Sequence, residues 1–117
     1  MPPSFTVGQI LWADLPYRTP AGHEQHGRRP VVVVAVPELV QPIPYRMLVV
    51  VPLTRTKIQG PLFPVLNSGV AGLPAESTAL MYQVTALDAS RVQGRIGILT
   101  DVEYEPIRAA LQVLFKQ

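Results

Sequence analysis

The chain has 117 residues, of which 48% are hydrophobic and 15% charged, with ten Lys and Arg against eight Asp and Glu. This composition favours one densely packed domain over residues 1–117 and excludes a disordered chain. The absence of cysteine excludes disulfide and thiolate chemistry. No signal peptide is evident, and the longest apolar run, residues 47–53, is too short for a membrane span. We therefore expect a soluble cytoplasmic protein that does not associate with a membrane.

Short strands separated by proline-rich connections account for most of the chain. Thirteen prolines within the first 106 residues leave room only for short elements, so an all-helical fold is disfavoured. Apolar and β-branched runs predict strands at residues 7–15, 31–36, 46–54, 77–84 and 95–99, with a weak pair of strands within 57–66. Residues 16–28, 37–45 and 67–76 are expected to be connections, and 89–92 a short turn. Pro52 indicates a bulge or an exposed edge near the end of the third strand.

The end of the chain changes to helical periodicity. Its apolar positions are Ile107, Ala110, Leu111 and Leu114. Thr100 and Glu103 have the spacing of a capping box. Pro106 would remove an internal hydrogen bond from a helix that begins at Asp101, so we expect a kink or a start near Glu105. Together the elements predict a mainly β fold, a small barrel or strongly bent sheet with one helix packed on it.

Residues 22–34 read Gly-His-Glu-Gln-His-Gly-Arg-Arg-Pro-Val-Val-Val-Val, a polar loop that runs into four valines. Pro30 suits the first position of a strand and holds Arg29 in an extended conformation. Arg29 is thereby fixed where a loop meets a rigid strand, which is a suitable place for a functional cation. The alternative is a surface arginine that pairs with Glu24. Arg28 is either a phosphate contact or a solvated loop residue.

The polar side chains of this loop include acid–base candidates. Glu24 could act as a general base or could only orient Arg29. His23 and His26 are further candidates because imidazole is a common acid–base group in enzymes, although two histidines in a polar loop are also commonplace. Their spacing is not His-Glu-x-x-His, and no further ligand is evident, so we expect no metal site.

Two aromatic residues are candidates for stacking on a planar group of a ligand. Trp12 lies in the middle of a predicted strand, so core packing is favoured for it. Tyr17 lies in the loop and is the better candidate.

Four stretches together resemble the MazF/PemK toxins of type II toxin–antitoxin systems. They are Val-Gly-Gln-Ile-Leu-Trp-Ala-Asp-Leu at 7–15, the 22–34 stretch quoted above, Val-Pro-Leu-Thr at 51–54 and Tyr-Gln-Val at 82–84. Arg95-Ile96-Gly97 and the closing amphipathic helix also fit. The resemblance covers nearly the whole chain in the right order, and its most specific part is Glu-Gln-x-Gly-x-Arg-Pro followed by Pro-Leu-Thr.

The resemblance implies an SH3-like, partly open antiparallel β-barrel with a C-terminal α-helix, and a homodimer. It implies a sequence-specific endoribonuclease that cuts single-stranded RNA without metal or cofactor, and a cognate antitoxin whose disordered tail covers the RNA groove. Arg29 and Thr54 match the catalytic arginine and threonine. Glu24 and Gln25 match the loop positions beside them, and Gln83 matches a glutamine near the groove.

This chain departs from many relatives at two positions. His23 replaces a small hydroxyl residue before the Glu-Gln pair, which would alter proton transfer. Thr85 replaces an arginine after Gln-Val, which removes a cation from the groove. The predicted catalytic residues are Arg29, Thr54, Glu24 and His23, and the predicted RNA-binding residues are Tyr17, Gln25, Arg28 and Gln83.

RNA can be cut without a metal when the ribose 2′-OH attacks the adjacent phosphorus, leaving 2′,3′-cyclic phosphate and 5′-OH ends. A guanidinium such as that of Arg29 stabilises the phosphorane by bidentate contact, and the hydroxyl of Thr54 can donate to a phosphate oxygen. Two other functions stay open on the same fold. One is a non-enzymatic DNA gyrase poison like the CcdB relatives, and the other is an inactive SH3-like module that binds an antitoxin or peptide.

Overall fold

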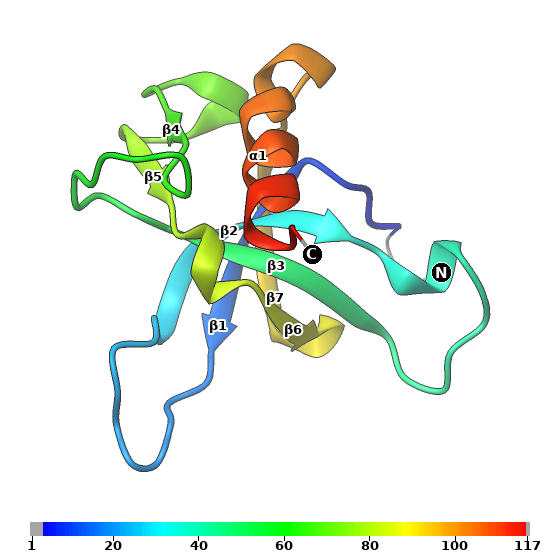
Figure 1. Cartoon of the computed structure of the whole chain (residues 1–117). Helices are drawn as coiled ribbons and strands as arrows, with labels where there is room; N and C mark the ends of the chain where they lie inside the picture. Colours follow the sequence, from blue (N-terminus) through cyan, green and yellow to red (C-terminus); the bar gives the residue numbers. More distant parts are fainter. Residues whose placement is uncertain (1–3, 117) are drawn as a thin grey trace.

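A curled antiparallel sheet with one helix forms the fold in the computed structural model, which describes residues 4–116 (Figure 1). The strands are β1 (Gln9–Leu15), β2 (Gly27–Ala35), β3 (Met47–Thr54), β4 (Val65–Leu66), β5 (Ser77–Ala79), β6 (Thr85–Asp88) and β7 (Val92–Ile98), followed by the helix α1 (Asp101–Leu114). Their order is β4-β5-β3-β2-β1-β7, and β6 also pairs with β3. The predicted mainly β, partly open barrel with a C-terminal helix is confirmed.

The valines of β2 supply both hydrophobic cores, because successive strand residues face opposite sides of a sheet. Val31 and Val33 pack with residues of β1, β3 and β6 in one core. Val32 packs in the other core, beneath α1 and with Ile107. All three valines are fully buried. The central strands are therefore covered on both faces, which explains their almost continuously apolar sequence.

Strand β3 lies inside the sheet, so the expectation of an exposed edge at Pro52 is wrong. One side of β3 pairs with β2, with Val31 opposite Pro52. The other side pairs first with β6, up to Val50, and then with β5, from Leu53. The Pro52 carbonyl accepts a hydrogen bond from the Leu80 backbone nitrogen (3.0 Å) on this second side. The nitrogen and carbonyl of a strand residue face the same neighbouring strand, so the Pro52 nitrogen, which has no hydrogen, also faces this second side. It lies between the end of the β6 pairing and the start of the β5 pairing.

The single strand expected over residues 77–84 is wrong, because the chain leaves the sheet after β5. Residues Met81–Gln83 form a short 3-10 helix, η3, before β6 begins at Thr85. Thr78 pairs with Thr54, whereas Thr85 pairs with Val50, so η3 carries the chain past Pro52. Of residues 57–66, only Val65–Leu66 form a strand, and they pair with β5.

The remaining turns are short 3-10 helices, η1 (Pro37–Leu39), η2 (Val70–Gly72) and η4 (Ala89–Arg91), and η4 lies within the turn expected at 89–92. Strand β7 begins at Val92, three residues before the predicted start. Within residues 4–116, no helix has both the length and the apolar character that crossing a membrane requires.

The helix α1 begins at Asp101, so the expected start near Glu105 is wrong and the capping box is confirmed. The Glu103 nitrogen donates to the Thr100 hydroxyl (3.2 Å), and the Thr100 nitrogen donates to the Glu103 carboxylate (2.8 Å). Pro106 lies inside the helix. The carbonyl that loses its partner there belongs to Val102, whose exposed position lets water replace the missing N–H.

Candidate active site

The two adjacent arginines lie within a strand, because β2 begins at Gly27 and not at residue 31. Arg28 and Arg29 stand opposite Asp14 and Ala13 of β1. The Nε of Arg29 donates to the backbone carbonyl of His26 at 3.2 Å, which leaves both terminal Nη atoms available. Arg29 forms no ion pair with Glu24 in the described part of the chain, so the alternative role for Arg29 as a partner of that carboxylate has no support.

Arg29 and Thr54 share a hollow of about 400 Å³, here called the Arg29 hollow. The antiparallel register explains this proximity, because Val31 pairs with Pro52, and Arg29 and Thr54 each lie two residues beyond this last pair. The lining consists of Trp12, Arg28, Arg29, Pro30, Leu53, Thr54, Arg55, Thr56, Leu73, Pro74, Ala75 and Ser77. This lining contains three arginines and no carboxylate, so the hollow favours an anion.

Thr54 presents a hydroxyl with a free proton at the end of β3. Its Oγ1 accepts a hydrogen bond from the Thr56 backbone nitrogen at 3.2 Å. A hydroxyl that accepts in this way can still donate its own hydrogen. Thr54 can therefore donate to an oxygen of a ligand in the Arg29 hollow.

Trp12 is only partly buried, so the expectation that it belongs to the core is wrong. The Arg28 guanidinium lies over its ring, with the guanidinium carbon 4.1 Å from the ring centroid. This cation–π contact holds a planar cation at the wall of the Arg29 hollow.

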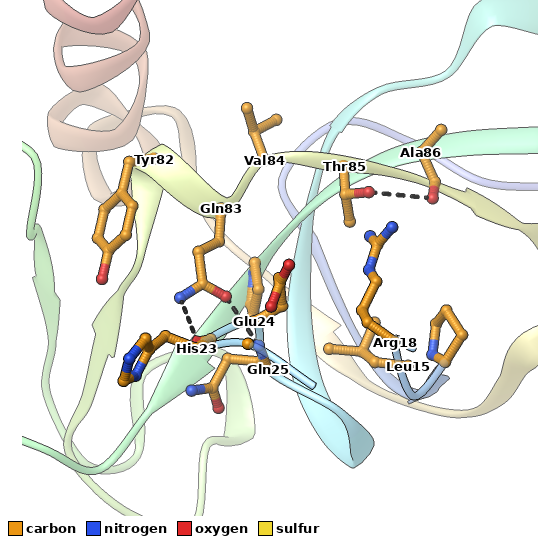
Figure 2. Close-up of a pocket in the computed structure, with 13 residues that line it drawn as sticks. Leu15, Arg18, His23, Glu24, Gln25, Tyr82, Gln83, Val84, Thr85 and Ala86 are labelled. Carbon is orange, nitrogen blue, oxygen red and sulfur yellow. Dashed lines mark hydrogen bonds between the residues drawn. The ribbon is translucent and has the colours of Figure 1, made fainter. Parts of the chain in front are cut away.

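His23, Glu24, Gln25 and Gln83 lie together in a second hollow of about 430 Å³, here called the Gln83 hollow (Figure 2). Its other lining residues are Leu15, Pro16, Arg18, Gly22, Pro52, Tyr82, Val84, Thr85 and Ala86. The predicted catalytic residues are thus divided between two hollows. Pro52 lines one hollow and Leu53 the other, and the two hollows have no lining residue in common.

The loop side chains differ in how they are held. The Glu24 carboxylate lies so close to Gly22 that an added Cβ there would clash with it. Gln25 keeps a buried side-chain oxygen without a hydrogen-bond partner. Tyr17 is 75% exposed and lies outside both hollows, with its ring centroid 4.3 Å from that of His26.

No cluster of three or more potential metal ligands occurs among residues 4–116.

Sequence reasoning missed three residues that line the hollows. Arg55 follows Thr54 directly, and Arg18 follows Tyr17, so adjacency to candidate residues was an available signal. Neither arginine forms a hydrogen bond or ion pair with another residue of the described chain. Figure 2 shows Arg18 extending toward Thr85. Arg18 therefore brings a cation toward the position at which many relatives carry an arginine and this chain carries Thr85. Tyr82 is the third, and it adds an aromatic ring to the Gln83 hollow.

Several solved structures share this fold. MazF from Deinococcus radiodurans is 22% identical, with a TM-score of 0.74 over 95% of this chain and 96% of that chain. The Mycobacterium tuberculosis toxin MazF-mt6 is 20% identical, with a TM-score of 0.71 over 92% and 95% of the two chains. An endoribonuclease from a Mycobacterial species, solved in complex with its cognate antitoxin, is 19% identical, with a TM-score of 0.72 over 94% and 93%.

Family membership follows from the sequence. The model of the PemK-like, MazF-like toxins of type II toxin–antitoxin systems matches residues 6–115, which include every strand and all of α1. The resemblance inferred from the short motifs is therefore confirmed over nearly the whole chain, and this protein belongs to the PemK-like, MazF-like toxin family.

Proposed function

We propose that the protein is a sequence-specific, metal-independent endoribonuclease that cuts single-stranded RNA and so inhibits translation of mRNA. The observation that carries this proposal is the Arg29 hollow, where Arg29 and Thr54 meet among three arginines without a carboxylate. Such a site favours a phosphodiester. Membership of the toxin family and similarity to a solved endoribonuclease support the same reaction.

In the proposed reaction, the ribose 2′-oxygen forms a bond to the adjacent phosphorus while the bond to the 5′-oxygen breaks. The Nη atoms of Arg29 bind the non-bridging oxygens, on which charge grows in the transition state. Thr54 donates its hydroxyl hydrogen to the same phosphate. Glu24 accepts the proton from the 2′-OH, and His23 gives a proton to the departing 5′-oxygen. The products are a 2′,3′-cyclic phosphate and a 5′-OH.

This assignment requires one RNA strand to reach both hollows, because Arg29 and Thr54 line the Arg29 hollow whereas Glu24 and His23 line the Gln83 hollow. Arg28 and Arg55 then bind phosphates on one side of the scissile bond, and Arg18 binds a phosphate on the other. Gln25, which lines the Gln83 hollow, contacts a base. Tyr17 stacks on a base further along the loop. The expected place of action is the cytoplasm, where mRNA is translated.

The test is incubation of the purified protein with a long RNA in EDTA. We expect discrete fragments whose 5′ ends are phosphorylated by a kinase without prior dephosphorylation, and whose 3′ ends carry a cyclic phosphate. Intact RNA in EDTA, or cleavage only after magnesium is added, would refute the proposal. Inhibition of gyrase by a protein that cuts no RNA would favour the CcdB-like alternative.

We also propose that two copies form a homodimer and that a cognate antitoxin inhibits it. Leu39 and Val40 are 70% and 86% exposed, and apolar side chains exposed to this extent favour burial against a partner. Light scattering at micromolar concentration should give twice the monomer mass, and a monomer mass would contradict the dimer. An acidic antitoxin tail should compete with RNA for the arginines, whereas simultaneous binding of both would contradict a shared site.

A further inference from the structure

The loop between β1 and β2 forms few hydrogen bonds with the rest of the protein. The β1–β2 pairing ends where Leu15 meets Gly27, so residues 16–26 lie beyond the sheet. Among residues 4–116, Gln83 is the only residue distant in sequence that forms a hydrogen bond with this loop. The loop that carries His23 and Glu24 therefore depends on one side chain for its tertiary hydrogen bonds.

Both ends of the Gln83 amide are used in this attachment. Its side-chain oxygen accepts a hydrogen bond from the Gln25 backbone nitrogen at 2.8 Å, and its side-chain nitrogen donates to the His23 backbone carbonyl at 3.2 Å. Figure 2 shows the two bonds side by side, and their partners His23 and Gln25 flank Glu24 in the sequence. An amide is suited to this task because it has an acceptor and a donor in one plane.

The backbone that carries Gln83 is itself firmly held. Gln83 is the last residue of η3, and its nitrogen donates to the Leu80 carbonyl at 2.9 Å. Met81, two residues earlier, is fully buried in the core beneath α1, together with Tyr104 and Ile107. Gln83 thus connects an exposed polar loop to an element that is anchored in the buried core beneath α1.

We propose that Gln83 is a positioning residue, which fixes the His23–Gln25 segment so that Glu24 and His23 face the scissile phosphate. This role rests on the proposed nuclease function. It differs from the direct RNA contact predicted for Gln83 from the sequence, because the amide acts on the reaction through the loop backbone. The substitution Gln83→Leu removes both hydrogen bonds while nearly preserving side-chain size.

The first measurement is backbone amide hydrogen exchange, which needs no RNA. In Gln83→Leu, the Gln25 amide should exchange faster than in the parent protein, while core amides such as that of Val32 stay protected. Gln112→Leu, an exposed change on α1, is the matched control and should leave Gln25 unaffected. Unchanged exchange at Gln25 in Gln83→Leu would overturn the proposal, whether or not the parent cuts RNA.

The second measurement separates positioning from direct binding. Misplaced catalytic groups should lower kcat of Gln83→Leu by about tenfold to a hundredfold, with a smaller change in KM. A raised KM with normal kcat and normal Gln25 exchange would instead identify an RNA contact and overturn the proposal. If the parent cuts no RNA, the nuclease proposal fails, and the exchange experiment still decides whether Gln83 holds the loop.

Gln83→Glu provides a conservative rescue. At neutral pH its carboxylate can accept from the Gln25 nitrogen but cannot donate to the His23 carbonyl, so the loop should be loosened. A protonated carboxyl has both an acceptor and a donor, so protection of the Gln25 amide, relative to the parent at each pH, should return below about pH 4.3. Protection that stays low in acid, with core amides still protected, would contradict the two-bond attachment.

Discussion

Conservative substitutions at Arg29 and Thr54 should separate catalysis from folding. Thr54→Val deletes only the hydroxyl, which accepts from the Thr56 nitrogen at 3.2 Å. Because Thr56 is exposed, water can replace that acceptor, and the variant should lose at most about 1 kcal/mol of unfolding free energy. Arg29→Lys keeps the charge but loses the planar fork and the Nε contact with the His26 carbonyl.

The effect on the reaction should be much larger than the effect on stability. Loss of one hydrogen bond that is strongest in the transition state costs about 3 kcal/mol, or roughly a hundredfold in rate, for either variant. The double variant should lose less than the product of the two single effects, because both side chains act on one phosphate.

The assay is single-turnover cleavage of a labelled RNA in EDTA, accompanied by thermal melts of every variant. Arg108→Lys on α1 and Thr6→Val before β1 are matched controls on exposed residues outside both hollows, and each should cut at the parent rate. If well-folded Arg29→Lys and Thr54→Val both cut RNA as fast as the parent, the reacting phosphate does not bind in the Arg29 hollow.

Three further predictions address the neighbouring hollow and the core. Gly22→Ala should displace the Glu24 carboxylate and lower kcat without changing the melting temperature. In the control Gly94→Ala, the added Cβ meets no atom closer than 3.9 Å, so kcat should not change. If Gly22→Ala has the same kcat as the parent protein, Glu24 is not catalytic. Arg18→Ala should raise KM and reduce the slope of log affinity against log salt by about 0.7, the value for one phosphate of a single strand, and an unchanged slope would exclude that contact. Burial raises the pKa of Tyr104 above its ordinary value of 10.0, so the unfolded chain ionises first and stability should fall as pH rises above 10. Tyr104→Phe should reduce that fall in denaturant titrations, and an unchanged alkaline profile would contradict it.

Local sequence patterns were sufficient for the elements whose causes are local. The valines after Pro30 form a buried strand because β-branched residues suit a pleated sheet covered on both faces. The capping box at Thr100 and Glu103 also depends only on neighbouring residues, and it determined the helix start more strongly than Pro106 did.

Residues 80–84 show where local reasoning fails. Leu-Met-Tyr-Gln-Val is a good strand sequence, and yet it contains η3. The cause lies about thirty residues earlier, because the partner strand offers no N–H at Pro52 and the chain must turn past that position. An interaction of this kind cannot be recognised before the strand pairing is known.

The candidate site was predictable in its residue types but not in its arrangement. The motif resemblance selected Arg29 and Thr54, and the register brings them into one hollow. No sequence signal indicated that Glu24 lines a separate hollow, because the path of the loop depends on hydrogen bonds from Gln83, nearly sixty residues later.

Pro52 also restricts which alternative pairings the sheet can form. Residues 49–51 are three successive valines, so side-chain chemistry alone would tolerate a shift of β6 along β3. A shift by two residues toward Thr54 would keep the same faces buried, but it would require a ladder hydrogen bond from a residue that has no N–H. Pro52 therefore disfavours a shifted pairing of β6 with β3. As a result, Leu53 and Thr54 stay available to pair with β5.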